Sequence, residues 1–258
     1  MMYHPFHMVE KSPWPLTSSM SAFCMIMGIL SYLNNKGNNL LMMSVICLIM
    51  SAYQWWRDIS REASFQGYHT KLVLIGLKIG MLLFILSEIF FFLFFELFFH
   101  MSLSPSIEIG SIWPPKNIMP FNPFEIPLFN SMILISSGIS VTWSHYSIMN
   151  KNYYMVLFSL KITIFLGLMF TIFQLWEYFQ ALFSISDSIF GSTFFLTTGF
   201  HGIHVIIGTM FLFISDFRIN NNLISSEHFF GFEASIWYWH FVDVIWLFLF
   251  TFMYWWIY

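Results

Sequence analysis

Ionisable side chains occur inside long apolar stretches of the sequence, and these residues are the first candidates for chemistry. They are Glu88, Glu96, Glu177, His201, His204, His240 and Asp243. A charged side chain in hydrocarbon costs several kcal/mol, so such a residue normally faces a partner, a cavity or a lipid headgroup. Each of these residues could therefore belong to a proton-linked site, a metal site or a polar contact between helices.

Glu88 is the most isolated of them, because bulky apolar residues surround it in the stretch 86–91. Such surroundings favour a neutral carboxyl, which can donate a hydrogen bond. Lys78 lies ten residues away, about 15 Å along the same expected helix, which is too far for a direct ion pair. A partner must come from another helix, from lipid or from water. Two interpretations stay open: a proton-linked or lipid-headgroup contact, and a neutral carboxyl that serves packing.

The histidines occur with helical spacing. His201 and His204 are three residues apart, as are His240 and Asp243, so each pair shares one face of its helix. Histidines that face each other across helices can bind a metal or a haem, and a pair on one helix suits a single metal ion better. No third ligand is evident, which favours a structural polar network between helices, with His240 and Asp243 as a polar pair. We expect Glu177 in the same network.

The two cysteines, Cys24 and Cys47, lie in apolar stretches without a second Cys or His at ligand spacing. They indicate neither a disulfide framework nor a metal site, and we expect small packing residues. The sequence also has no Gly-rich phosphate loop, nucleophile elbow or basic patch for nucleic acid. We therefore expect no catalytic residue, no metal ligand and no nucleic-acid partner.

Composition indicates the elements that must position these residues. Of the 258 residues, 58% are hydrophobic and 9% are charged, whereas a soluble domain usually carries about 25% charged residues. Lipid is therefore the expected solvent, and a spanning helix needs about 20 apolar residues. Hydropathy predicts an all-α protein with seven transmembrane helices. The expected spans are 16–33, 39–56, 72–99, 127–146, 154–183, 189–214 and 234–256.

The connections between spans carry turn residues, as in 34–38 and the Pro-rich segment 113–127. Lys and Arg in alternate connections predict orientation, because they concentrate on the inner side. Six lie on the N-terminal side and two on the other: Lys11, Arg57, Arg61, Lys71, Lys151 and Arg218, against Lys36 and Lys116. This count places the N-terminus inside. Lys78 and Lys161 lie within spans, near enough to the same face to snorkel to it.

A basic loop, Arg57 to Glu62, is expected directly after the second span. Arg57 and Arg61 occur beside Trp55 and Trp56, and His69 lies a few residues further on. Such a segment can bind anionic lipid headgroups, or its charges can be ordinary interfacial residues paired with neighbouring acids. The adjacent tryptophans favour the lipid contact.

Several unbroken stretches resemble cytochrome c oxidase subunit III, and they occur in order along essentially the whole chain. They are HMV at 7–9, SPWPL at 12–16, YQWWRD at 53–58, FQGYHT at 65–70, WPP at 113–115, GSTFF at 191–195, TGFHGIHVIIG at 198–208, FGFEA at 230–234 and WYWHFVDVIW at 237–246. Glu96 departs from the pattern, since the family commonly has Trp there. The high content of Phe and Met is typical of AT-rich genes, as in many insect mitochondrial genomes.

The resemblance implies a V-shaped arrangement of a two-helix bundle (1–70) and a five-helix bundle (71–258), with phospholipids in the cleft. It implies a mitochondrial inner-membrane subunit, N-terminus in the matrix, that packs beside catalytic subunit I, with subunit II and small accessory subunits in the same complex. Haem and copper belong to the partner subunits. Glu88 matches the family's carbodiimide-reactive carboxylate. Positions linked with lipid headgroups match Trp56, Arg61, His69 and Arg218.

The resemblance thus predicts a non-catalytic core subunit that supports electron transfer from cytochrome c to oxygen and proton translocation. Two alternatives follow from the polar residues themselves. His201, His204 and His240 could make the chain a metal- or haem-binding redox subunit. Glu88 and Glu177 could serve a proton-coupled transporter, although the sequence has no clear internal repeat, which such folds usually contain.

Overall fold

The computed structural model describes residues 6–102 and 118–258. Most of this part of the chain is helical, and it contains no strands. The motif WPP at 113–115 and the connecting residue Lys116 lie outside the described residues. Seven helices are long and apolar enough to cross a membrane, which confirms the predicted number of spans. The helices are α1 (Trp14–Leu33), α2 (Asn39–Arg61), α3 (Lys71–Ser102), α4 (Ile126–Met149), α5 (Tyr153–Gln180), α6 (Ile189–Asn220) and α7 (Phe230–Leu249).

Two helices continue as π-helices, in which backbone hydrogen bonds span one more residue than in an α-helix. α2 runs into η1 (Glu62–Gln66), and α7 runs into η3 (Phe250–Trp255). The second span therefore ends later than the expected residue 56, and Arg57 to Arg61 are helical rather than a loop. The extension carries a tertiary contact, since Nε1 of Trp14 in α1 donates to Oδ2 of Asp58 at 2.7 Å.

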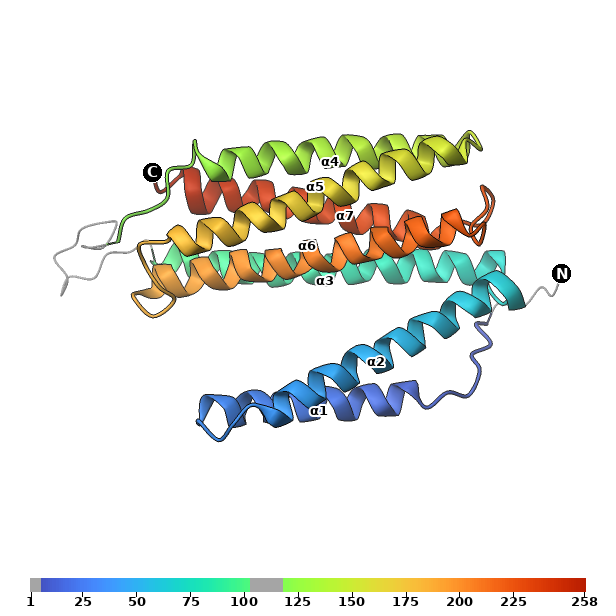
Figure 1. Cartoon of the computed structure of the whole chain (residues 1–258), viewed down its shortest axis with the longest axis horizontal. Coiled ribbons are helices and arrows are strands. Elements are labelled where there is room, and N and C mark those ends of the chain that lie inside the picture. The colour runs from blue at the N-terminus through green and yellow to red at the C-terminus, as the bar shows by residue number, and fades with distance from the viewer. Residues whose placement is uncertain (1–5, 103–117) are drawn as a thin grey trace. The chain divides into compact units, whose positions relative to one another are not determined.

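The chain divides into two compact units, residues 1–77 and 78–258, whose boundary falls within α3. In the first unit, α1 packs along α2 (Figure 1). The contact is closest at Gly28, where an added Cβ would lie 2.7 Å from Cα of Leu41. Most large apolar side chains of α1 and α2 are exposed, which suits a lipid environment and would be unusual in a soluble monomer.

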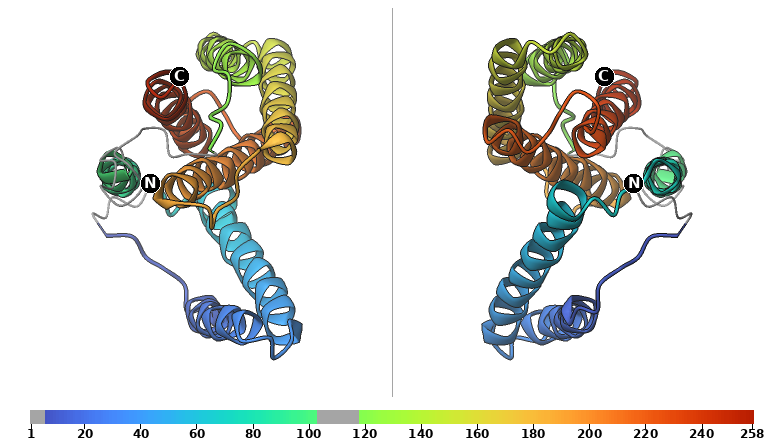
Figure 2. Two further views of the ribbon diagram at one scale, coloured as in Figure 1. Left: turned by 90° about the vertical axis from the view of Figure 1, so that its left-hand side faces the viewer. Right: turned by 90° about the vertical axis from the view of Figure 1, so that its right-hand side faces the viewer.

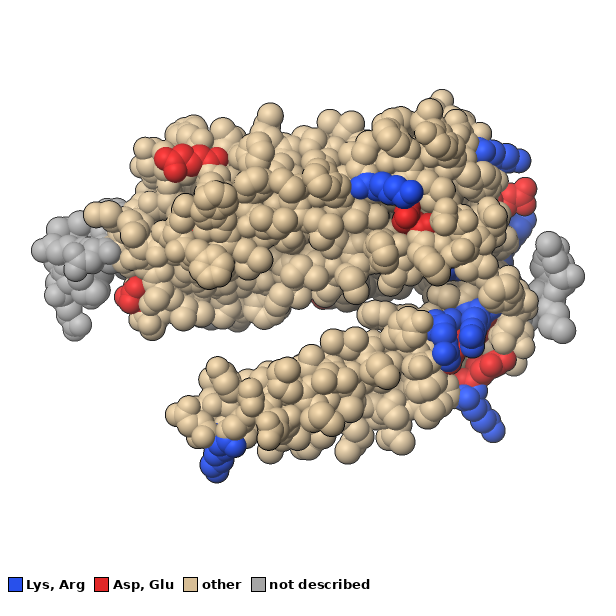
Figure 3. All heavy atoms as spheres, viewed as in Figure 1, with Lys and Arg blue, Asp and Glu red and all other residues tan. Residues whose placement is uncertain are grey.

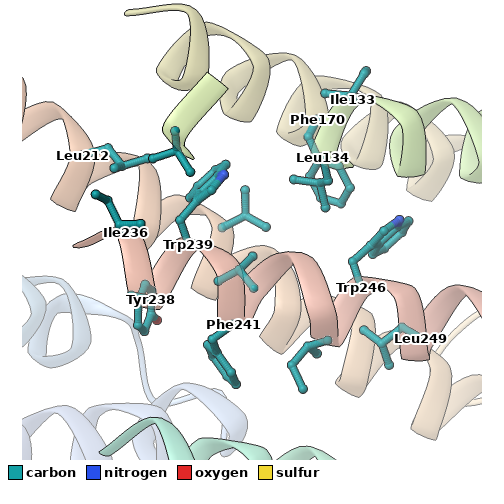
Figure 4. Close-up of a cluster of buried hydrophobic side chains, with 14 of the residues drawn as sticks. Ile133, Leu134, Phe170, Leu212, Ile236, Tyr238, Trp239, Phe241, Trp246 and Leu249 are labelled. Atoms are coloured by element: carbon teal, nitrogen blue, oxygen red, sulfur yellow. The ribbon is translucent and has the colours of Figure 1, made fainter. Parts of the chain in front are cut away.

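In the second unit, α4, α5, α6 and α7 form a closed ring in which each helix packs on the next and α7 returns to α4 (Figures 1 and 2). α7 supplies much of the core. Trp239 and Trp246, seven residues apart, project from α7 towards α4 and α5, whereas Tyr238 and Phe241 project from its opposite side (Figure 4). Both indoles are fully buried, and they donate to Oγ of Ser137 and Oγ of Ser131 at 2.9 and 3.0 Å.

α3 contacts this ring through large side chains. Phe91 meets Phe200 of α6, and Phe92 meets Phe241 of α7, with ring centroids 5.0 and 6.3 Å apart. On the face drawn in Figure 3, charged side chains gather towards the helix ends and the middle of the surface is free of them. This distribution is what a hydrocarbon layer requires of a spanning protein.

Candidate functional site: the intramembrane polar residues

Glu88 of α3 has a partner on α6. Its Oε2 lies 3.6 Å from Nε2 of His204, and Nδ1 of the same imidazole lies 2.6 Å from the hydroxyl of Tyr238 on α7. The rings of Phe92 and Phe241 flank the imidazole at centroid distances of 5.4 and 5.8 Å. Three polar groups from three helices thus form a row inside an aromatic shell. When the Tyr238 hydroxyl donates to Nδ1, Nε2 carries its proton towards Glu88.

His201 lies on the same side of α6 but contacts a different group. Its Nε2 is 3.2 Å from the carbonyl oxygen of Val242, to which it can donate. The rings of Phe170 and Trp246 pack against it at 5.6 and 5.1 Å. His201 and His204 therefore both face α7, and each has its own protein contact there. This geometry is a helix–helix polar contact and offers no shared ligand position.

His240 and Asp243 approach each other along α7. Nδ1 of His240 is 3.8 Å from Oδ2 of Asp243. The carboxyl lies over α4 at Gly138, where an added Cβ would be 2.9 Å from Oδ2. A glycine on α4 thus makes room for a half-buried carboxyl group on α7.

Glu177 belongs to a second polar cluster, at the other end of the ring. The residue is 1% exposed, and both carboxyl oxygens lack a hydrogen bond within the described residues. Nδ2 of Asn130 donates weakly to Oε1 of Gln174 at 3.5 Å. Tyr178 and Thr198 share a hydrogen bond of 2.6 Å between α5 and α6. A buried carboxyl in such surroundings is most stable in its neutral form.

Lys78 makes a contact that the sequence did not reveal. Its Nζ lies 2.8 Å from Oε2 of Glu233, in the first turn of α7, and 5.9 Å from the ring of Trp237. Snorkelling alone therefore does not account for Lys78, because a carboxylate of the same unit meets it. The sequence showed an acidic residue, Glu233, directly before the last expected span, but no spacing pairs it with Lys78.

The expected lipid-contact residues lie in different parts of the chain. Trp56 and Arg61 are exposed on the last turns of α2, where Oδ1 of Asp58 lies 3.1 Å from Arg57 and 3.9 Å from Arg61. Arg218 lies in the last turn of α6, in the second unit, with Nη1 close to Gly231. Glu96 lies towards the end of α3.

His69 lies near two residues that sequence reasoning did not select. Its ring packs edge-on against His7 at 5.3 Å, and Oε2 of Glu62 is 3.4 Å from Nε2 of His7. Glu62 lies seven positions before His69, and His7 lies more than fifty positions before Glu62. Neither separation indicates that the residues meet, so only the fold brings them together.

These features define a class: a polytopic helical membrane protein whose intramembrane ionisable groups contact one another, aromatic rings and the backbone. Comparison with known proteins gives the family. The family model for cytochrome c oxidase subunit III matches residues 4–258, and the chain belongs to this family.

Curated relatives match this chain over 97–100% of their own length. The chain is 70% identical to cytochrome c oxidase subunit 3 of the tick Rhipicephalus sanguineus, over 99% of this chain and 100% of that protein. It is 54% identical to the Aedes aegypti protein and 55% identical to that of Myxine glutinosa, each over 98% of this chain and 97% of the relative. The tick protein is thus more similar than this insect one. The family is a non-catalytic core subunit of an oxidoreductase complex, respiratory complex IV of the mitochondrial inner membrane.

Proposed function

We propose that the chain supports the oxidase by stabilising catalytic subunit I, in a complex with subunit II and small accessory subunits. The observation that carries this proposal is that Oε2 of Glu88 lies against His204 and Nε2 of His201 lies against the Val242 carbonyl. Such contacts fix helices and present no ligand set for haem or copper. No observation favours an independent redox subunit or a transporter.

The test is the turnover of purified oxidase with and without the chain. We expect the complex that lacks it to start at a normal rate and to lose activity during sustained turnover, because the catalytic subunit has lost a neighbour that stabilises it. Addition of the full chain in detergent before turnover should restore durability. Equal durability without the chain would contradict the supporting role.

We further propose that phospholipid headgroups contact Trp56, Arg61 and His69 in the first unit and, independently, Arg218 in the second. An exposed tryptophan beside exposed cations at a helix end is typical of a headgroup contact. Lipids retained by purified oxidase can be counted by mass spectrometry. Arg61→Gln should lower the count of anionic lipid. Lys36 is an exposed cation in the α1–α2 turn, and Lys36→Gln should leave the count unchanged. Equal lipid counts in the two variants would refute the contact.

Glu88 is proposed as the carbodiimide-reactive carboxylate, supported by its position in mid-span beside His204. A carbodiimide reacts with a carboxyl group in an apolar environment, and aromatic rings flank the imidazole that Glu88 contacts. Glu88→Gln should abolish labelling in the folded chain, and Glu177→Gln should preserve it. Labelling that persists in Glu88→Gln would assign the reactivity to Glu96 or Glu177.

The N-terminus is proposed to lie in the matrix, because six cations fall on its side and two on the other. Protease added to intact inner-membrane vesicles of known sidedness tests this orientation. Cleavage at an epitope tag before residue 6 only in inside-out vesicles is the expected result, and cleavage only in right-side-out vesicles would reverse the assignment.

A further inference from the structure

Three potential metal ligands come together in the first unit: His7, Glu62 and His69. One ligand atom from each lies within 4.8 Å of the other two. Among the described residues, no other group of three His, Cys, Asp or Glu side chains meets this condition. We propose that these residues form a binding site for a divalent transition metal ion, with Zn²⁺ as its preferred occupant.

The local backbone explains why Glu62 and His69 meet. η1 widens the end of α2, and Gly67 then takes a left-handed conformation with φ of +68°. The amide of Tyr68 donates to the carbonyl of Glu62 at 3.2 Å, which closes the turn. The chain therefore folds back on itself after η1, and His69 returns to the level of Glu62. π-Helical turns of this kind are frequent at functional sites.

His7 completes the group from the N-terminal segment that precedes α1. Its Nε2 lies 3.4 Å from Oε2 of Glu62, and 30% of its side chain is exposed. It also lines a small cavity of about 170 Å³ with Leu72, Val73 and Gly76. The imidazole is thus held near the carboxylate but remains accessible, so an ion can reach it from solution.

The carboxylate of Glu62 supplies the electrostatic argument. The residue is 6% exposed, and neither its Oε2 nor Nε2 of His7 makes a hydrogen bond within the described part of the chain. A buried carboxylate oxygen without a hydrogen bond is unfavourable. A cation held between Oε2 and the two imidazoles removes that penalty and uses the lone pairs that these atoms present.

The donor set selects the metal. Two imidazoles and one carboxylate are the ligands of many zinc sites in which a fourth position stays open. Mg²⁺ and Ca²⁺ prefer oxygen ligands alone. In a tetrahedral zinc site, bonds of about 2.0–2.1 Å place ligand atoms about 3.3 Å apart, close to the 3.4 Å between His7 and Glu62. His69 needs a shift of the order of 1 Å, which a side-chain rotation provides.

The ion would join the N-terminal segment to the turn after α2, two parts of the chain that are far apart in sequence. Zn²⁺ has no redox chemistry, so the site is compatible with a subunit that carries no redox centre. Its open position can take water or a phosphate oxygen of a lipid headgroup, which keeps the site compatible with the lipid contact proposed for His69.

Zinc binding to the full chain in detergent, purified with a histidine-free tag, tests the proposal. Zn²⁺ is titrated in competition with a fluorescent zinc chelator, and helicity is checked by circular dichroism. We expect one Zn²⁺ per chain, unaffected by excess Mg²⁺. Affinity should fall at least about tenfold in each of His7→Gln, Glu62→Gln and His69→Gln, since even the loss of an outer partner weakens metal sites tenfold or more.

Two controls match these variants. Glu10→Gln removes an exposed carboxylate of the same N-terminal segment, and His228→Gln removes an exposed imidazole between α6 and α7; both should bind zinc like the unaltered chain. Loss of zinc binding in His7→Gln cannot be attributed to a misfolded helix, because His7 precedes the first helix. The proposal is refuted if the unaltered chain binds no zinc, or if the three ligand variants bind as tightly as the two controls.

Discussion

Substitution of Gly208 by alanine tests the packing of α6 against α7 most directly. An added Cβ would lie 2.9 Å from Cε3 and 3.2 Å from Cζ3 of Trp239, whereas carbon atoms in contact prefer about 3.5–4.0 Å. The clash therefore requires a displacement of about 0.6 Å. Trp239 cannot move away freely, because α5 passes close to its far edge, where a Cβ added at Gly167 would lie 2.7 Å from Cη2, and Ser137 accepts its indole N–H.

Gly202 is the matched control on the same helix, because an added Cβ there meets nothing within 4 Å. Both substitutions gain the intrinsic preference of alanine for helices, about 1 kcal/mol, and this gain cancels in the comparison. Overpacking of a core costs about 1–3 kcal/mol. Gly208→Ala should therefore be about 1–3 kcal/mol less stable than Gly202→Ala.

The assay is thermal unfolding of the purified full chain in detergent, followed by tryptophan fluorescence. A difference of 1 kcal/mol corresponds to about 2–4 °C for a chain of this length. When Trp239→Phe is added to both alanine variants, the benzene edge of the indole is removed. The difference between their melting temperatures should then be smaller. Equal melting temperatures for Gly208→Ala and Gly202→Ala would show that the indole is not confined as described.

Three further outcomes follow from close contacts elsewhere. Gly28→Ala should destabilise the first unit by about 3 kcal/mol, because its Cβ would meet the backbone of Leu41, which cannot rotate away; thermal unfolding equal to that of the unaltered chain would contradict this. Trp246→Phe and the Ser131→Ala change should couple in a double-mutant cycle by about 0.6–1.7 kcal/mol, the range for hydrogen bonds between membrane helices, and zero coupling would exclude a contribution. Gly67→Ala should lower the free energy of unfolding by about 1–2 kcal/mol and Gly67→Asn by less, because φ at this position is positive. Zinc binding that weakens in Gly67→Ala alone would link the turn to the metal site. Identical zinc binding and stability in the two variants would refute the strain at Gly67.

The spans could be predicted because their signal is local. A run of about 20 apolar residues suffices to identify a spanning helix, whatever it packs against. The end of α2 was placed too early because Arg57 and Asp58 look like interfacial loop residues. In the structure they are helical, and Asp58 accepts a hydrogen bond from Trp14 of α1, a contact that residue types along the chain do not indicate.

The pairing of polar residues could not be predicted from spacing. Glu88 was recognised as needing a partner on another helix, but the choice of His204 depends on the rotation of α3 and α6 about their axes. The same holds for Lys78, whose partner Glu233 lies 155 positions along the chain. Rotation is decided by the side chains that fill the space between helices, such as Phe91 against Phe200.

The amino-acid sequence by itself determined the solvent of this protein, the number of its spans and its family, because each is encoded in composition, run length or contiguous motifs. Tertiary structure alone decided which groups meet: Glu88 with His204, Lys78 with Glu233, and Glu62 with two histidines. The physical reason is that a contact between distant residues depends on the packing of entire helices and turns. That packing is a property of all their side chains together.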